Sequence, residues 1–223
     1  YATNVSLSAD GSIAFVAAGS SGVQIIDVSN SSNPALISSL ATLADASKVT
    51  LSPEGDTAFV TCFSTSSGVQ IFDISDLAKP SLIGTLDHSG YVMDFALSAD
   101  GSTAFVVGYQ SGLRIIDISD LSTPSVLATY NPSGLTQVVT LSSDGNTALL
   151  SEDGKGLHVL DISSISVPSL VGIIDTFEGS ADANSSVSGY LVDLALSSDD
   201  NTAFVANTDV GLQIFDIHSH TSD

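Results

Sequence analysis

The chain has 223 residues, 43% of them hydrophobic, and carries 25 acidic residues against four Lys and Arg, for a formal net charge of −21. Such a surface repels phosphate backbones and anionic membranes, so nucleic acid is a poor partner. Membrane insertion is not expected either, because no apolar run approaches the roughly 20 residues of a membrane span. Divalent cations are compatible with this charge, but acidity also serves simply to keep a secreted or salt-exposed protein soluble.

The chain begins at Tyr1 without a Met or a signal-peptide pattern, which favours a mature form or a fragment. Cys62 is the only cysteine, so the chain has no internal disulfide, and we expect it to be a small core residue. Few Lys, abundant Ser and Thr and the missing disulfide favour an extracellular or cell-surface location.

In chain order, a strand ending in Leu-Ser comes first and is followed by a tight turn, as in Asp10-Gly11. Asp-Gly between apolar strands is a strong hairpin signal, because glycine takes the positive φ that the turn needs. A second strand (Ile13–Ala17 in the first unit) leads to the third, which opens at Gly22 with GVQIIDVS. This third strand is apolar on both faces, as expected of a strand with two buried sides.

A fourth strand follows Pro34 and is richer in Ser and Thr, as an outer strand would be. The unit then repeats, and its shared aspartate returns at Asp27, Asp73, Asp117, Asp161 and Asp216. A period of about 45 residues with four strands per unit predicts an all-β fold, a β-propeller of five four-stranded antiparallel blades. The last blade lacks its outer strand in this chain.

We expect one propeller domain over residues 1–223. The blades are placed approximately at 1–43, 44–87, 88–131, 132–176 and 189–223, with an inserted loop at about 175–189. Whether five blades close a ring or belong to a longer propeller is left open.

The unit G-L/V-x-I-x-D-I/V-S, followed by the Pro-led strand, resembles the LVIVD repeat of bacterial and archaeal surface β-propellers. The resemblance covers essentially the whole chain, apart from His218 in the place of Ser and the missing fifth outer strand. It implies an extracellular scaffold or interaction domain, often part of a larger protein, and no particular chemistry.

The five repeated aspartates invite comparison with a ring of metal ligands, but each closes a third strand just before a turn. There a carboxylate accepts hydrogen bonds from amides two or three residues on, so we expect them to be structural. Asn4, Asp94 and Asp193 are the candidate metal ligands, because their oxygens suit Ca²⁺ if the first strand lines a central channel. Lys48 at the same repeat position could instead pair with a carboxylate there. No other cofactor is expected.

One face of the expected propeller carries uniform turns, and the other carries the variable second-to-third-strand loops and the links between blades. Variable loops on a rigid frame are where binding sites are usually built. The candidate partner-binding residues on this face are Phe63, Tyr109, Glu152, Asp153, Glu178, Asp182 and Asp209. The alternative is that the insertion is only a tolerated surface loop.

The leading hypothesis is a non-enzymatic, extracellular scaffold or interaction module that binds a protein or cell-surface partner on the loop-rich face. A second hypothesis is a structural subunit that assembles head-to-tail through the unpaired strand edge of the last blade, as a homo-oligomer in a surface layer or filament. An enzyme with an unrecognised polar pocket is the third, and no motif in the sequence supports it.

Overall fold

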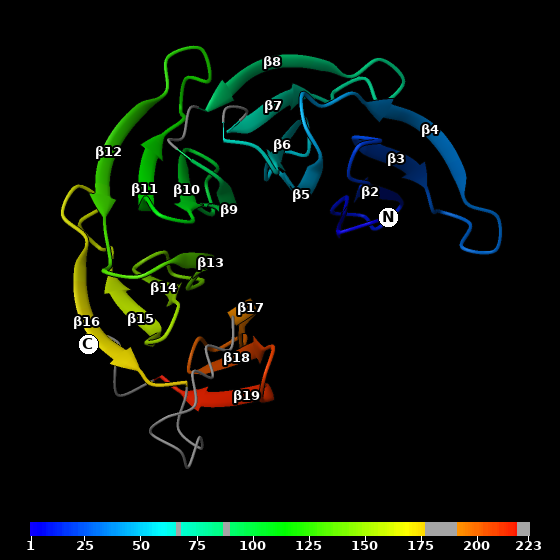
Figure 1. Ribbon diagram of the computed structural model, residues 1–223. Coiled ribbons are helices and arrows are strands. Elements are labelled where there is room, and N and C mark those ends of the chain that lie inside the picture. The colour runs from blue at the N-terminus through cyan, green and yellow to red at the C-terminus, as the bar shows by residue number, and fades with distance from the viewer. Residues whose placement is uncertain (66–67, 87–89, 177–190, 218–223) are drawn as a thin grey trace. The chain divides into compact units, whose positions relative to one another are not determined.

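The computed structural model describes the whole chain except residues 66–67, 87–89, 177–190 and 218–223. The described residues form five antiparallel sheets in which consecutive strands are neighbours (Figure 1). The first four sheets have four strands and the fifth has three. The fold class predicted from the repeat, a five-bladed all-β propeller with a shortened last blade, is therefore confirmed.

The strands of each blade follow one another with short turns. The first blade comprises β1 (Asn4–Leu7), β2 (Ile13–Ala17), β3 (Val23–Asp27) and β4 (Ala35–Leu40). The second comprises β5 (Ala46–Leu51), β6 (Thr57–Cys62), β7 (Val69–Asp73) and β8 (Ser81–Leu86). The third comprises β9 (Val92–Leu97), β10 (Thr103–Gly108), β11 (Gly112–Asp117) and β12 (Ser125–Tyr130). The fourth comprises β13 (Thr136–Leu141), β14 (Thr147–Glu152), β15 (Gly156–Asp161) and β16 (Ser169–Ile174). The fifth comprises β17 (Leu191–Leu196), β18 (Thr202–Asn207) and β19 (Gly211–Asp216).

The chain divides into two compact units, residues 1–92 with 120–124 and residues 93–119 with 125–223. In the first unit, β5 of the second blade contacts β1 and β2 of the first. In the second unit, β13 of the fourth blade contacts β10 of the third and β17 of the fifth. The single domain expected from the sequence stays a prediction.

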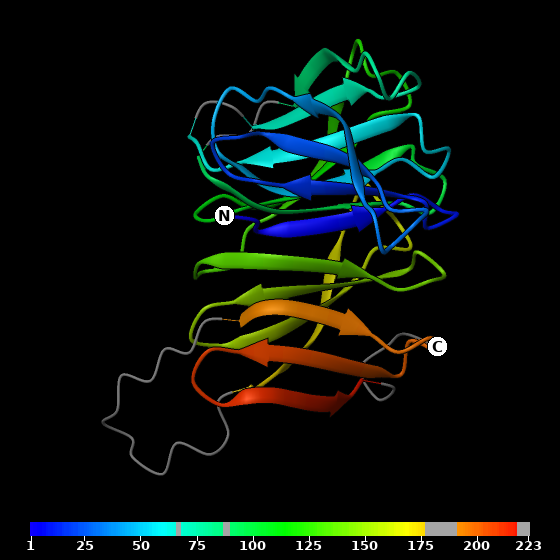
Figure 2. The ribbon, with the colours of Figure 1, turned by 90° about the vertical axis from the view of Figure 1, so that its right-hand side faces the viewer.

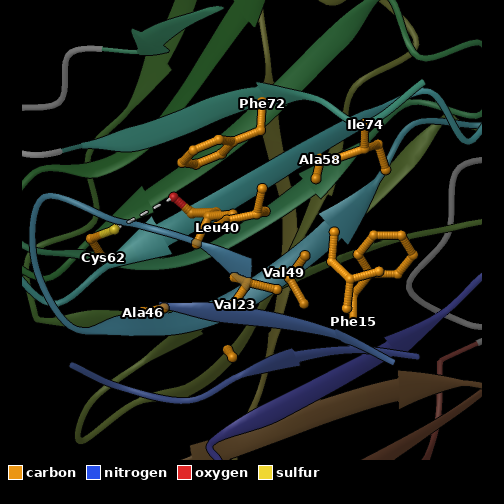
Figure 3. Close-up of a cluster of buried hydrophobic side chains, with 12 residues drawn as sticks. Phe15, Val23, Leu40, Ala46, Val49, Ala58, Cys62, Phe72 and Ile74 are labelled. Carbon is orange, nitrogen blue, oxygen red and sulfur yellow. Dashed lines mark hydrogen bonds between the residues drawn. The ribbon is translucent and has the colours of Figure 1, made fainter. Parts of the chain in front are cut away.

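Blades are held together by apolar cores between their faces. In the first unit, Phe15, Val23 and Ile25 of the first blade are buried in one cluster with Val49 and Val60 of the second (Figure 3). The middle strands β10 and β14 are buried along their whole length, whereas β4, β8 and β16 are exposed at most positions. Burial on both faces explains why the middle strands lack the apolar–polar alternation of a one-sided sheet.

The turn between the first two strands has the same geometry in every blade. Gly11 has a φ of 70°, and its N–H donates to the Ser8 carbonyl at 2.8 Å. The fifth blade has Asp200 in place of this glycine, with a φ of 58° and the same bond to Ser197. Aspartate is among the few non-glycine residues that adopt this conformation readily, so the turn survives the substitution.

The pairing of the third and fourth strands contains a register shift at the same place in each of the four complete blades, as between Ile25 and Ile26. Such a bulge increases the local twist and carries the outer strand away from a flat edge. Among the described residues there is no helix that could cross a membrane.

Candidate interaction face and a buried Glu152–His158 cluster

The repeated aspartates lie at the ends of the third strands. In each of the first four blades, the carboxylate accepts hydrogen bonds from the N–H and the hydroxyl of the serine two residues on. Asp27 illustrates this, with 2.9 Å from Ser29 N and 2.6 Å from Ser29 Oγ. The same contacts join Asp73 to Ser75, Asp117 to Ser119 and Asp161 to Ser163. In the fifth blade, Asp216 ends β19, and the residues after Ile217 lie outside the described ranges.

These bonds lower the pKa of the carboxylates. Serine hydroxyl and backbone N–H donors stabilise the charged form of Asp27, Asp73, Asp117 and Asp161. The aspartates of the first-to-second-strand turns are held in the same way, and bonds from Ser8 and Ser12 lower the pKa of Asp10 to about 2.

Acid should therefore weaken the fold. Groups whose pKa is lower in the folded than in the unfolded chain stabilise the fold above their ordinary value of 3.8, and this contribution is lost as the pH falls towards 2. We expect the urea midpoint to fall between about pH 5 and pH 2.5. The variant Asp10→Asn keeps an acceptor that does not titrate, so it should lose less stability over this interval than the parent. Equal midpoints at both pH values would contradict the prediction.

The candidate metal ligands of the first strands accept hydrogen bonds from the protein backbone. Asn4 Oδ1 accepts from Val49 N at 3.1 Å, which joins the first blade to the second. Asp94 is buried, and its two oxygens accept from Phe95 N at 2.8 Å and from Val139 N at 3.0 Å, which joins the third blade to the fourth. Asp193 is exposed and accepts from Leu194 N. Within the described ranges, no group of three or more His, Cys, Asp or Glu side chains is placed to hold a metal ion.

The predicted partner face is partly exposed and partly interior. Phe63 is 61% exposed, Asp209 is exposed, and Tyr109 and Asp153 are half-buried. Glu178 and Asp182 lie outside the described residues.

Glu152 does not lie on the surface, where the sequence analysis expected it. Its side chain is fully buried, because the link between the third and fourth blades folds over it. Asp153 N donates to the Leu135 carbonyl at 2.8 Å, and a Cβ built on Gly134 would lie 2.8 Å from Glu152 Oε1. Glycine at position 134 thus allows the link to approach the carboxylate.

Glu152 belongs to a cluster that the sequence analysis did not identify. Its Oε1 accepts from Ser133 Oγ at 2.9 Å and lies 3.0 Å from Lys155 Nζ, which also contacts Ser133 Oγ. Its Oε2 lies 2.5 Å from His158 Nε2. The alignment of that pair is poor for a hydrogen bond, so we treat the contact as electrostatic.

On its other side, His158 Nδ1 lies 2.8 Å from the Tyr130 hydroxyl. A neutral imidazole that accepts this hydroxyl at Nδ1 keeps its proton on Nε2, the atom that faces Glu152. Burial lowers the pKa of His158 and outweighs the opposing effect of Glu152, so the neutral form is favoured. Burial also raises the pKa of Tyr130, with a further contribution from the Glu152 charge.

Glu152 remains ionised in spite of its burial. Burial alone would raise its pKa, but hydrogen bonds from Lys155 and Ser133, together with the positive charge of Lys155, more than compensate and lower it. Each oxygen of the carboxylate is thus in contact with another side chain of the same cluster. The cluster therefore joins Tyr130 of the third blade, and Ser133 of the link that follows it, to His158 and Glu152 of the fourth blade.

A signal for this cluster was present in the sequence. Glu152 ends the second strand, where other blades have Ala18, Cys62, Gly108 and Asn207. His158 replaces the glutamine or arginine of the third strand, and the antiparallel register places Leu150 opposite His158 and Glu152 opposite Gly156, so both ionisable residues lie on one face. Because both residues depart from the repeat in the same blade and on the same face, the sequence indicates that their side chains are neighbours.

The loop face of the first unit carries exposed apolar side chains. The rings of Phe63, in the loop between β6 and β7, and Tyr91, in the link before β9, have centroids 5.1 Å apart and lie 32° from parallel. Tyr91 is 40% exposed, and Leu43, in the link between β4 and β5, is 70% exposed. Phe63 N donates to the Asp45 carbonyl at 2.8 Å, so the Leu43 link and the Phe63 loop are neighbours. We call Leu43, Phe63 and Tyr91 the loop patch.

Comparison with solved structures shows the same fold in proteins of distant sequence. A periplasmic gluconolactonase of Pseudomonas aeruginosa aligns with 99% of this chain and 68% of its own length, at a TM-score of 0.78 and 20% identity. The Cps50 (Swd1) β-propeller domain of Myceliophteria thermophila aligns at a TM-score of 0.76 and 13% identity, over 99% of this chain and 71% of its own. A protein of unknown function from Desulfotomaculum acetoxidans aligns at 0.77 and 19%, over 97% and 68%.

No curated protein matches the chain. The LVIVD repeat, in contrast, matches it four times, at residues 1–42, 45–88, 89–132 and 134–176. These ranges correspond to the first four blades and cover well over half of the sequence. The chain belongs to the LVIVD-repeat family of β-propellers.

Proposed function

We propose that this chain is a non-enzymatic, extracellular interaction module that binds a protein partner through its variable loops. The observation that carries the proposal is the loop patch. Phe63, in the loop between β6 and β7, and Tyr91, in the link before β9, form an exposed ring pair. Aromatic side chains dominate the energy of many protein interfaces because they bury a large area at low entropic cost.

The charge of the chain supports a particular kind of partner. A net charge of −21 attracts basic surfaces and accelerates their encounter with the chain at low salt. We therefore expect a protein with a basic rim around an apolar centre. The extracellular location is proposed from the composition. A resident Ca²⁺ at Asn4, Asp94 and Asp193 stays a prediction.

The likeness to a gluconolactonase bears on the fold alone, because the identity is 20%. The buried Glu152 cluster fits a structural role better than a catalytic one, since its carboxylate is already engaged by Ser133, Lys155 and His158.

Replacing both rings of the loop patch should weaken partner binding and leave the fold intact. For Phe63→Ser combined with Tyr91→Ser, we expect the dissociation constant to rise at least tenfold, because ring pairs of this kind act as binding hot spots. The assay compares the basic proteins retained from the extracellular fraction by the immobilised parent and variant chains. Calorimetric titration then gives the affinity of each retained protein.

Leu82→Ser is the matched control, since Leu82 is 48% exposed on β8 and lies outside the loop patch. It should retain the same proteins as the parent. The melting temperatures of all three chains should agree, because the changed side chains are exposed. Undiminished binding by the double variant would contradict the proposal.

Assembly through the last blade is the second candidate. In the described residues, β19 pairs with β18 on one side and forms the outer edge of its sheet. An open strand edge of this kind can accept a strand from another chain.

A further inference from the structure

Three interfaces between neighbouring blades follow one rule. In the fourth blade, Leu149, Leu157 and Val159 lie on one side of the sheet and pack into a core with Leu194, Ala203 and Val205 of the fifth. We call the side of a blade that packs against the following blade its trailing face. The side that packs against the preceding blade is its leading face. The trailing face of the first blade (Phe15, Val23, Ile25) packs with Val49, Ala58 and Val60 of the second, and that of the third (Phe105, Leu113, Ile115) with Val139, Ala148 and Leu150 of the fourth.

The fifth blade exposes its own trailing face. In the repeat, Phe204, Leu212 and Ile214 take the places of Leu149, Leu157 and Val159. The residues of the fourth blade are fully buried, whereas those of the fifth are 36%, 67% and 61% exposed. The three antiparallel strands that carry this face are drawn in orange to red in Figure 2. Its residues are apolar because they occupy repeat positions that, in the first, third and fourth blades, pack against the following blade.

The first blade exposes the complementary surface. Val5 and Leu7 of β1 occupy the repeat positions of Leu194 and Leu196, which belong to the leading face of the fifth blade. They are 59% and 56% exposed. Val5 and Leu7 are therefore exposed on the leading face of the first blade, as Phe204, Leu212 and Ile214 are on the trailing face of the fifth.

A polar contact repeats along with the faces. Asn4 and Asp94 each accept a backbone N–H from the first strand of the following blade, from Val49 and Val139. Asp193 has the same place in the fifth blade, and its Oδ1 accepts from Leu194 N as Asp94 Oδ1 does from Phe95 N. Its exposed carboxylate is therefore positioned to accept an N–H from a blade that follows.

We infer that the trailing face of the fifth blade binds the leading face of the first blade of a second copy of this chain. The partner surface is specified by chemistry that this chain uses at three of its own interfaces, and Val5 and Leu7 provide it. The contact joins two different surfaces, so it is a heterologous interface, and successive copies would be arranged head-to-tail. It uses the face of the sheet, not the β19 edge, and it is independent of the loop patch.

Charge sets the conditions under which association should be seen. Two chains of net charge −21 repel each other at low ionic strength, and salt screens this repulsion. We expect the average mass measured by sedimentation equilibrium to rise with protein concentration, and to rise more steeply at high salt. Asp193→Ala should weaken the association about tenfold, through loss of one charge-assisted hydrogen bond.

Two single variants make the test specific. Leu7→Lys places a charge on the leading face, and Leu212→Lys places one on the trailing face. Each variant alone should remain monomeric, because every contact between its copies includes a charged face. Mixed together, they should form a one-to-one complex of twice the chain mass, because one intact leading face then meets one intact trailing face.

Leu36→Lys is the control, because Leu36 is 63% exposed on the outer strand β4 and belongs to neither face. It should associate like the parent, and circular dichroism should show that all variants keep the strand content of the parent. A parent that is monomeric at every concentration and salt would overturn the inference. So would association that survives both single substitutions, which is the result expected of pairing along the β19 edge.

Discussion

Alanine at Gly156 is expected to cost about 3 kcal/mol of folding free energy, from the positive φ and from a backbone clash. Gly156 has a φ of 99°, and a Cβ there would lie 2.1 Å from the Ile174 carbonyl oxygen of the outer strand β16. Neither atom can move away cheaply, because both belong to the backbone of paired strands. The fourth strand would have to detach from β15 at this end.

Gly211→Ala is the matched control for this change. Gly211 opens the third strand of the fifth blade with a φ of 82°. A Cβ there would meet none of the described residues within 4 Å, because the sheet that they form in this blade has three strands. It should lose only the conformational part, about 1 kcal/mol. Urea unfolding of both variants measures the difference, and equal losses would show that the contact with β16 is not the cause.

Glu152→Gln should destabilise the chain by about 2 kcal/mol, because it removes the charge around which a buried cluster is arranged. The ammonium of Lys155, 3.0 Å from Oε1, loses its counter-charge, and the histidine loses an anion 2.5 Å from Nε2. Half of the Lys155 side chain remains exposed, which limits the loss.

The control is Glu54→Gln, the same substitution on an exposed turn. It changes the net charge equally and should leave the unfolding free energy within about 0.5 kcal/mol of the parent. The two variants are compared by urea unfolding at neutral pH. If both had the same stability, the cluster would contribute nothing to the joint between the blades.

The repeat predicted most of the fold because each blade contains the same local sequence signals. Asp-Gly marks the first turn, the proline marks the start of the outer strand, and the doubly apolar third strand marks the interior. Each signal spans only a few residues, so it can be recognised within one blade. Its recurrence in five blades strengthens the assignment of the strands and turns. Asp200 shows the limit of such a rule, since the turn forms there with a different residue in the same backbone conformation.

The candidate site was less predictable because its contacts join residues far apart in the sequence. Phe63 meets Tyr91 across 28 positions, and Tyr130 meets His158 across the same interval. Placing Glu152 on the surface was wrong because loop position alone does not show whether a link folds over a side chain. Gly134 permits this close approach because it has no Cβ, and the distance between the two residues is known only from the structure.

The first-to-second-strand turns also bear on how the protein ages. An aspartate followed by glycine is prone to cyclise, because the glycine nitrogen can attack the carboxyl carbon and form a succinimide. At Asp10, Asp100 and Asp144, the carboxylate is held by the N–H two residues on, at 3.0, 3.0 and 2.9 Å. The following glycine nitrogen donates to a serine carbonyl at 2.8, 2.9 and 3.0 Å. Folding thus keeps both reactants apart at three of the most labile linkages in the chain, and the intact turn protects its own covalent structure.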